Sequence, residues 1–118
     1  MPHSLRSFLD SIDNRMVHIH DELDPVSQVG YLCSESAGPL MMHNLKGYPG
    51  WRLTDILIKD RAGQAAAFGL ENENDVCPYL ADKMATKRGK SVMVDDGPVK
   101  EIKMLGSDID LHKLPIPI

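Results

Sequence analysis

Helical and strand patterns alternate along this 118-residue chain, and that order restricts it to the α/β class. In the predicted helices apolar residues recur every three or four positions, whereas in the predicted strands they alternate with polar residues. The helices are expected at residues 4–14, 25–35, 60–69 and 78–88, and the strands at 16–20, 39–45, 52–58, 91–94 and 99–105. Asp95-Asp96-Gly97 is typical of a hairpin turn between the last two strands. We therefore predict a small mixed-sheet α/β domain flanked by helices, with an extended C-terminal exit segment.

The exit segment is apolar and stiffened by proline. It ends in Leu114, Pro115, Ile116, Pro117 and Ile118. Proline removes backbone donors and fixes φ, so these residues are expected to be extended rather than helical. Aliphatic side chains on an extended strip gain free energy only by covering another surface. We therefore expect residues 1–110 to form the domain and residues 111–118 to form a linker that docks on a partner or continues into further polypeptide.

Charge and hydropathy exclude several classes of partner. The net charge is −4 and no basic block is present, so nucleic acid is not an expected partner. No apolar run approaches the roughly 20 residues that span a bilayer, and the first residues lack the pattern of a secretory signal. Cys33 and Cys77 are far apart and form no metal-binding or redox motif. A cytoplasmic protein with reduced thiols is the simplest interpretation.

Two histidines share one face of the strand predicted at 16–20. There Val17 and Ile19 are expected to point inward, which leaves His18 and His20 on the other face. A metal site could be built from them with nearby acidic residues, but zinc needs three or four converging ligands. A solvent-facing polar edge is the favoured interpretation. His43 is interpreted either as a polar strand end or as a pocket residue.

The remaining candidates for chemistry have simpler explanations. Cys33 lies on the apolar side of a predicted helix, which favours burial over nucleophilic catalysis. Asp108 and Asp110 lack the other ligands of a calcium loop and suit a tight turn. The glycines around Lys46 match no phosphate-binding motif. The sequence therefore assigns no catalytic, cofactor-binding or metal-binding residue, and the docking residues 114–118 are its only site prediction.

Three stretches, in order, resemble the start of UbiD-type decarboxylases, which use prenylated FMN. The first is LRSFL at residues 5–9 followed by HIHDELDP at 18–25. The second is GPLMMHNLKGYPG at residues 38–50. The third is PVKE at residues 98–101 followed by DIDLHKLPIP at 108–117, which is the most specific of the three. The Lys-Gly-Tyr-Pro-Gly sequence at 46–50 is most similar to members that act on hydroxybenzoates and related aromatic acids.

The resemblance implies a role without implying a site in this chain. In that family the residues that hold prenylated FMN, its metal-bridged phosphate and the acid–base network lie beyond the Leu-Pro-x-Pro segment. The complete enzyme is expected to use prenylated FMN with a divalent metal ion, with or without potassium, and to be an oligomer. This chain is then the non-catalytic N-terminal portion or a small subunit, packed against the flavin-binding portion. The alternative is a stand-alone structural or partner-binding subunit with no direct role in decarboxylation.

Overall fold

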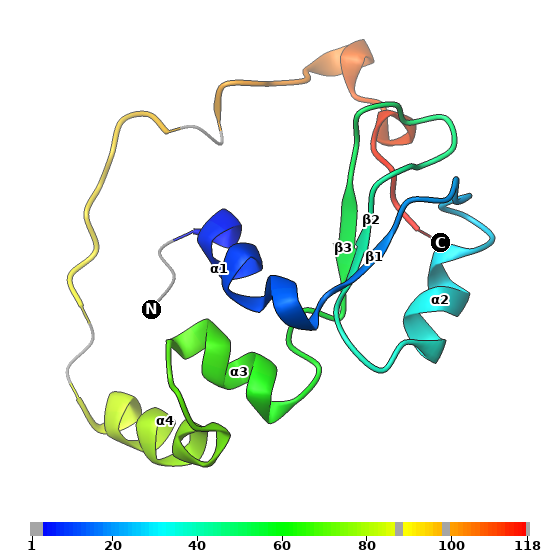
Figure 1. The fold of residues 1–118 in the computed structure, drawn as a ribbon. Helices are drawn as coiled ribbons and strands as arrows, with labels where there is room; N and C mark the ends of the chain where they lie inside the picture. Colours follow the sequence, from blue (N-terminus) through cyan, green and yellow to red (C-terminus); the bar gives the residue numbers. More distant parts are fainter. Residues whose placement is uncertain (1–3, 87–88, 98–99, 118) are drawn as a thin grey trace.

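A computed structural model describes residues 4–86, 89–97 and 100–117. Figure 1 shows a small sheet with helices on either side and a long outlying loop. The helices are α1 (Leu5–Ile12), α2 (Val29–Glu35), α3 (Arg61–Phe68) and α4 (Val76–Ala85), and the strands are β1 (Val17–Ile19), β2 (Leu40–Met42) and β3 (Leu53–Asp55). Single 3₁₀ turns occur at Asp13–Arg15, Glu73–Asp75, Gly106–Asp108 and Leu111–Lys113. The predicted α/β class is therefore confirmed.

The sheet is mixed, as predicted, and its order is β1-β2-β3. β1 pairs in parallel with β2, with Val17 opposite Leu40, and β2 pairs antiparallel with β3, with Met42 opposite Leu53. All three residues of the central strand β2 are buried. β1 is an edge strand, so Val17 is 51% exposed and the expectation that it points into the core is wrong.

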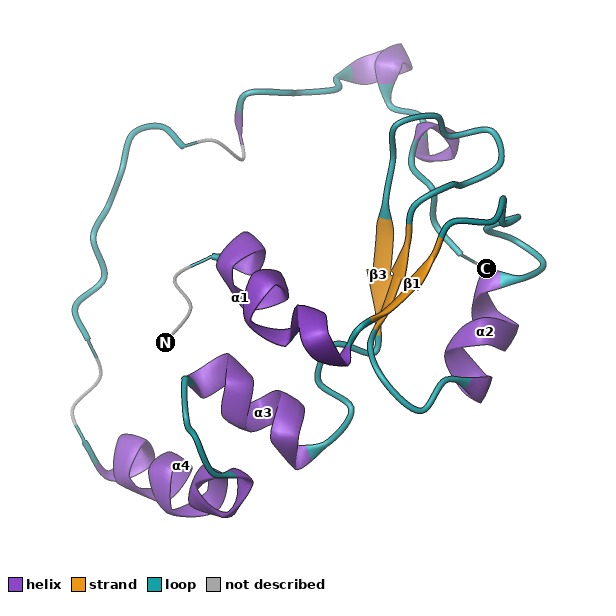
Figure 2. Cartoon of the chain, viewed as in Figure 1, coloured by secondary structure: helices purple, strands orange, loops and turns teal. Residues whose placement is uncertain are grey.

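The two faces of the sheet carry separate apolar clusters. Leu40 and Met42 lie in a cluster with Val29 of α2. Met41 points to the opposite face, because side chains alternate along a strand, and it packs with Phe8 and Ile12 of α1. Figure 2 shows the corresponding arrangement, with α2 on one side of the sheet and α1 and α3 on the other.

Local capping explains why α1 and α3 begin where the sequence predicts, and why α3 ends there. In α1 the Ser7 amide donates to Ser4 Oγ at 3.2 Å and the Ser4 amide donates to Ser7 Oγ at 3.1 Å, a reciprocal cap. In α3 the Gly63 amide donates to Asp60 Oδ1 at 2.7 Å. The helix ends at Gly69, whose φ of 69° lies in the left-handed region that glycine adopts without strain.

The second helix begins later than the Asp-Pro pair predicts. Residues 25–28 form a turn in which the Val26 amide donates to Asp24 Oδ1 at 2.9 Å. The Asp24 amide donates to the side-chain oxygen of Gln28 at 2.7 Å, so this turn has its own side-chain caps. α2 therefore begins at Val29.

The predicted hairpin is absent from the part of the chain that the structure describes. Residues 91–94 and 100–105 contain no strand, while Pro98 and Val99 lie outside the described residues. The Lys100 amide donates to the Gly97 carbonyl at 2.8 Å. The described limbs on either side of these two residues nevertheless diverge (Figure 1). Proline at the turn removes a backbone donor, and an isolated two-stranded hairpin is only marginally stable in water.

The last residues return to the sheet and pack near α2 (Figure 1). The hydroxyl of Tyr48 donates to the carbonyl of His112 at 2.8 Å, and Pro115 is buried. The described helices include none long and apolar enough to cross a bilayer.

The molecule is more open than a compact domain of its size. Its radius of gyration is 17.7 Å, against about 13.5 Å for a compact chain of this length. Its accessible surface is 9321 Å², against about 6,400 Å² for a compact protein of this mass. Much of the surface that a closed fold would remove from water is therefore still exposed.

Candidate functional site

The predicted docking residues lie along the returning tail, residues 111–117. Leu114 is half-buried and Pro115 is buried, while Ile116 is 48% exposed and Pro117 is exposed. Ile118 lies outside the described residues. The start of the strip thus packs on its own domain, and the outward-facing remainder is available to a partner.

Beside this tail lies an apolar hollow of about 250 Å³. Its walls are Val26, Tyr48, Leu111, His112, Leu114 and Ile116. The hydrogen bond from Tyr48 to His112 joins the turn before β3 to the tail and so fixes one side of the hollow. The hollow is open and apolar, which suits packing of aliphatic side chains rather than catalysis.

A second uncovered apolar region begins at α4. In the described part of the chain, no residue between Val76 and Pro115 is buried. On α4 the predicted apolar face is present, but Leu80 is 39% exposed and Met84 is 86% exposed. The helix contacts α3 through the rings of Phe68 and Tyr79, whose centroids are 5.2 Å apart. Beyond α4 the chain exposes further aliphatic residues, so the uncovered apolar surface continues past this helix.

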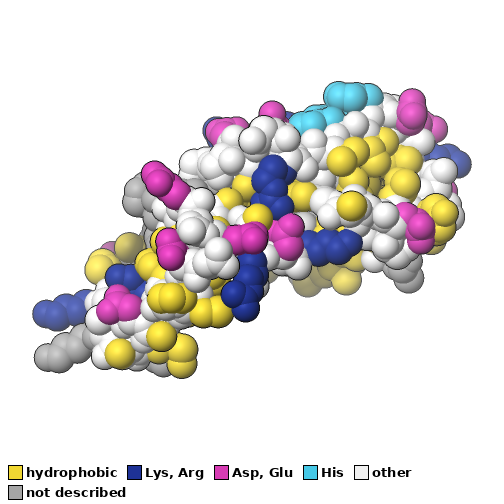
Figure 3. Space-filling view, turned by 60° about the horizontal axis from the view of Figure 1, so that its bottom comes forward, with side chains coloured by type: hydrophobic (Ala, Val, Ile, Leu, Met, Phe, Trp, Pro, Cys, Tyr) yellow, Lys and Arg dark blue, Asp and Glu magenta, His cyan; other side chains and the backbone are white. Residues whose placement is uncertain are grey.

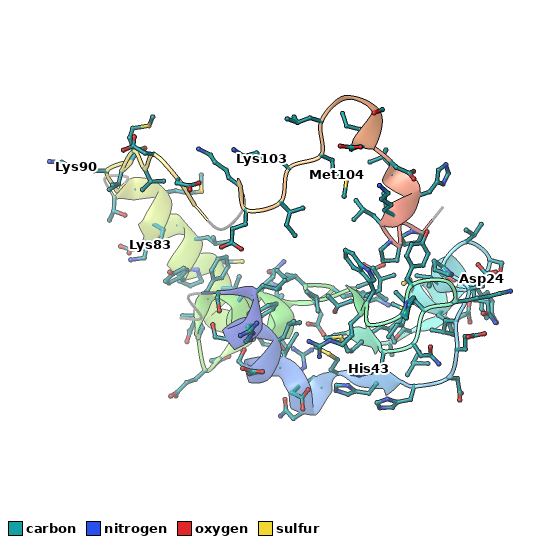
Figure 4. All side chains as sticks on the ribbon, turned by 90° about the horizontal axis from the view of Figure 1, so that it is seen from above. Asp24, His43, Lys83, Lys90, Lys103 and Met104 are labelled. Atoms are coloured by element: carbon teal, nitrogen blue, oxygen red, sulfur yellow. The ribbon has the colours of Figure 1, made fainter. Side chains whose placement is uncertain are left out.

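Three histidines form a stack on the α1 side of the sheet, beyond the end of α1. His18 and His20 are on β1 or next to it, and His43 follows β2. The ring centroids of His20 and His43 are 4.4 Å apart and those of His18 and His43 are 5.1 Å apart. Figure 3 shows histidine side chains at one edge of the molecule, next to apolar surface, and Figure 4 places His43 close to β1. The parallel pairing of β1 and β2 is what brings His43 to the other two.

A hydrogen-bonded chain runs through this stack. Nδ1 of His18 and Nε2 of His43 are 2.8 Å apart, so one carries the shared proton and the other accepts it. Nε2 of His18 lies 3.1 Å from Oδ1 of Asp13. The pKa of His43 is lowered, first by partial burial and then by the neighbouring His20, His18 and Arg52. His43 is therefore biased toward its neutral form.

The histidine stack does not have the geometry of a metal site. Its rings are nearly parallel, with interplanar angles of 12° and 23° between His43 and its two neighbours, so their nitrogens do not converge on one point. Among the residues that the structure describes, no group of three His, Cys, Asp or Glu side chains could hold a metal ion. His18 and His20 are exposed, in agreement with the polar-edge interpretation.

The other candidates from the sequence have structural roles. Burial, followed by the nearby Asp55 carboxylate, raises the pKa of the Cys33 thiol to about 11, which disfavours the nucleophilic thiolate. Asp110 caps a 3₁₀ turn, since its Oδ1 accepts from the His112 amide at 2.9 Å. Gly47 and Gly50 have φ values of 83° and 80°, which confirms the turn predicted around Lys46.

Neither described hollow fits a flavin nucleotide. A second hollow of about 230 Å³ lies between α1 and α3, and flavin-sized ligands need pockets of roughly 300–1,000 Å³. Arg15 lines it, but its guanidinium is paired with Asp60 through an Nη2–Oδ2 distance of 2.8 Å. No polar or charged side chain in the described structure is buried. The residues present therefore do not fit prenylated FMN, and that this chain binds no cofactor by itself stays a prediction.

Comparison with solved structures gives a match over almost the whole chain. The fold matches the solved structure of an evolved dimeric form of the UbiD-class enzyme HmfF from Pelotomaculum thermopropionicum in complex with prFMN. The match covers 99% of this chain with a TM-score of 0.82 and 30% sequence identity, and it spans 28% of that enzyme's chain. No protein-family profile matches the chain, and no curated protein matches it.

The structural match extends over the stretches that carry the sequence motifs, from the opening helix to the Leu-Pro-x-Pro tail. At 30% identity the likeness includes sequence as well as fold. The resemblance to UbiD-type enzymes is therefore confirmed, and the chain has the fold of a UbiD-type domain that spans little more than a quarter of a UbiD-class enzyme.

Proposed function

We propose that this chain is the non-catalytic N-terminal portion, or a small subunit, of a prenylated-FMN-dependent aromatic acid (de)carboxylase. In this proposal it packs against the flavin-binding portion of the enzyme. The observation that carries the proposal is the match of almost the whole chain to 28% of a prFMN-bound UbiD-class enzyme. The remaining 72% of such an enzyme is then the natural partner.

The character of the described surface supports a packing role. Enzyme sites depend on polar groups held in water-excluded positions. The described part of this chain buries apolar side chains only, and its hollows are small and open. Its exposed aliphatic residues instead suit a partner surface, with the tail from Leu111 to Pro117 as the proposed docking segment.

The complete enzyme, in this proposal, holds prenylated FMN with a divalent metal ion, with or without potassium, on the flavin-binding portion. The bound flavin would supply the chemistry of carboxyl transfer. The Lys-Gly-Tyr-Pro-Gly turn at 46–50 favours hydroxybenzoates or related aromatic acids as substrates. We further propose that the assembled enzyme is oligomeric and cytoplasmic.

Coexpression tests this function directly. The tagged chain is produced together with the flavin-binding polypeptide of the same enzyme, and the mixture is analysed by size-exclusion chromatography with light scattering. We expect a stoichiometric complex. Release of CO₂ from a hydroxybenzoate should then require both polypeptides and prenylated FMN.

Two results would contradict the proposal. Turnover by the isolated chain would show that it has its own active site. A flavin-binding polypeptide that is fully active, and does not bind this chain, would remove the packing role. A complex whose activity does not depend on this chain would instead favour the stand-alone structural subunit.

A further inference from the structure

One region of the molecule is outlying, exposes aliphatic side chains and is held at both ends. We call residues 90–97 and 100–105 the arm. Before it, α4 packs on α3 through the Phe68 and Tyr79 rings. After it, the tail is fixed by the hydrogen bond from Tyr48 to His112. The arm is therefore a bridge between two anchored elements rather than a fraying end.

The arm exposes the residue types that favour β-strands. Val92 is 81% exposed, Val94 is 66% exposed and Ile102 is 82% exposed. In an extended chain every second side chain lies on the same side, so Val92 and Val94 share a face, as do Ile102 and Met104. β-branched residues in such alternation are typical of a strand that packs one face against a partner.

The backbone of each limb of the arm is unpaired. Among the described residues, the amides and carbonyls of 91–94 and 102–104 make no hydrogen bond. Where the limbs meet, the Asp95 carbonyl accepts from Lys100 Nζ at 3.2 Å and the Gly97 amide donates to Asp96 Oδ1 at 2.8 Å. The arm runs apart from the sheet and helices (Figure 1), and Figure 4 shows Lys90 and Lys103 on this outlying loop, away from His43. An outlying segment with exposed backbone groups and exposed β-branched side chains is suited to pairing with the edge of another sheet.

The size of the exposed surface indicates a large partner. The accessible surface of 9321 Å² exceeds that of a compact protein of this mass by about 2,900 Å². A stable interface buries roughly 800 Å² on each partner. The arm, with α4 and the tail beside it, therefore offers enough surface for a permanent interface.

From these observations we infer that the arm binds by β-strand addition to an open sheet edge of the flavin-binding portion. This inference rests on the proposed function, which supplies the partner. The match to the UbiD-class enzyme covers 99% of this chain, so the matched stretch spans the arm. In that enzyme the same chain also contains the other 72%, which favours this partner over a second copy of this chain.

A proline scan of the arm in the complex tests the inference. In a paired edge strand, alternate amides donate to the partner, so only alternate positions should be sensitive to loss of the N–H. Val92, Met93 and Val94 are replaced singly by proline and, as matched controls, by alanine. The same pair of changes is made at Ile102, Lys103 and Met104. Affinity for the flavin-binding polypeptide is measured by calorimetry, and backbone protection is measured by hydrogen exchange.

We expect proline to weaken binding at least tenfold more than alanine at alternating positions. The amides at those positions should become protected only in the complex. A complex in which proline and alanine variants behave alike, with the arm amides still exchanging freely, would overturn strand addition and leave the proposed function in place. Absence of any complex would overturn both.

Two further results would also overturn the inference. Concentration-independent protection of the arm in the isolated chain would show that the limbs pair with each other as a hairpin. Protection that rises with the concentration of the isolated chain would identify a second copy as the partner.

Discussion

Residues 5–76 and residues 77–114 contain similar aliphatic side chains but differ completely in burial. The first region, which we call the body, closes around β2 and contains every buried side chain of the described structure except Pro115. The second region contains the arm and all of α4 except its first residue, Val76, and it buries none of its described side chains. A pattern of apolar residues therefore predicts that a segment packs against some other surface. It does not predict whether that surface belongs to the same chain or to another polypeptide.

A pair of methionines gives the largest expected contrast between the two regions. Met42 is fully buried in the body, whereas Met93 is 95% exposed in the arm. Met42→Ala should destabilise the isolated chain by about 2–5 kcal/mol, because it leaves a cavity at the centre of the sheet. Met93→Ala should change its stability by no more than about 0.5 kcal/mol. Urea unfolding of both variants measures these changes. Equal losses of unfolding free energy would show that the two regions do not differ in packing.

Two glycines of the body differ in how closely other atoms surround them. A Cβ added to Gly63 would lie 3.0 Å from the Leu57 carbonyl oxygen, whereas one added to Gly30 would meet nothing within 4 Å. Gly63→Ala should therefore cost about 1–3 kcal/mol. Gly30→Ala, in helix α2, should stabilise by roughly 0.5–1 kcal/mol. Thermal unfolding compares the two, and a neutral Gly63→Ala would show that the α3 start is not tightly packed.

The Asp60 cap should make the body sensitive to acid. The pKa of Asp60 lies below its usual value because the Gly63 amide and then Arg15 favour the carboxylate. Its contribution is complete above the unfolded-state pKa and is lost as pH falls through the lower folded-state value. Asp60→Ala should cost about 1 kcal/mol near neutral pH. Asp60→Asn keeps a capping oxygen, so it should lower the free energy of unfolding by less than Asp60→Ala does. Because asparagine does not titrate, the loss of stability caused by protonation of Asp60 should also disappear. Unfolding curves measured between neutral and acid pH check both outcomes.

The contact between Tyr48 and His112 should hold the tail to the body with a smaller energy. Tyr48→Phe removes a hydrogen bond worth roughly 0.5–1.5 kcal/mol. We expect faster hydrogen exchange at the amides of residues 112–114 and 116 and nearly unchanged exchange in β2. In the unsubstituted chain the amides of β2 should exchange more slowly than those of the tail, and this difference serves as the internal reference. An unchanged tail in Tyr48→Phe would show that Leu114 and Pro115 hold it without this bond.

The histidine stack should give the smallest effect. Because the folded-state pKa of His43 is lowered, the unfolded chain binds its proton more readily. Stability should be constant above the ordinary histidine pKa and should fall slightly as pH drops from there toward the folded-state pKa. His43→Gln should remove that slope. NMR titration of the imidazole protons measures the pKa directly. A value above that of a free histidine would contradict the lowering of the His43 pKa by burial and by His20, His18 and Arg52.

The sequence predicts those parts of the fold that depend on neighbours in the chain. Ser4, Asp60 and Gly69 mark the ends of α1 and α3 because caps act over three or four residues. The exposure of Val17 was not predictable, because it depends on β1 being an edge strand. The hairpin prediction failed for a related reason, since alternation identifies strand-forming residues without naming the strand they pair with.

The same limit applies to the candidate site. The sequence placed His18 and His20 on one face but did not bring His43 to them, which requires the register of β1 against β2. The pairing of Ile19 with Met42, continued by one residue along both strands, sets His20 opposite His43. Only this strand pairing could have identified His43 as a member of the stack. The tail residues 114–117 were identified as apolar and extended, but the contact of Tyr48 with His112 joins residues 64 positions apart and leaves no local pattern.

Residue-resolved hydrogen exchange of the isolated, monomeric chain is the most direct test of the central claim. It shows whether the body is folded while the arm remains unpaired in the absence of a partner. We expect strong protection at β2 and at α1, and exchange close to the unprotected rate at residues 91–94 and 102–104. Arm amides in the monomer that are as well protected as those of β2 would contradict this claim, because the chain would then satisfy its own strands and need no partner.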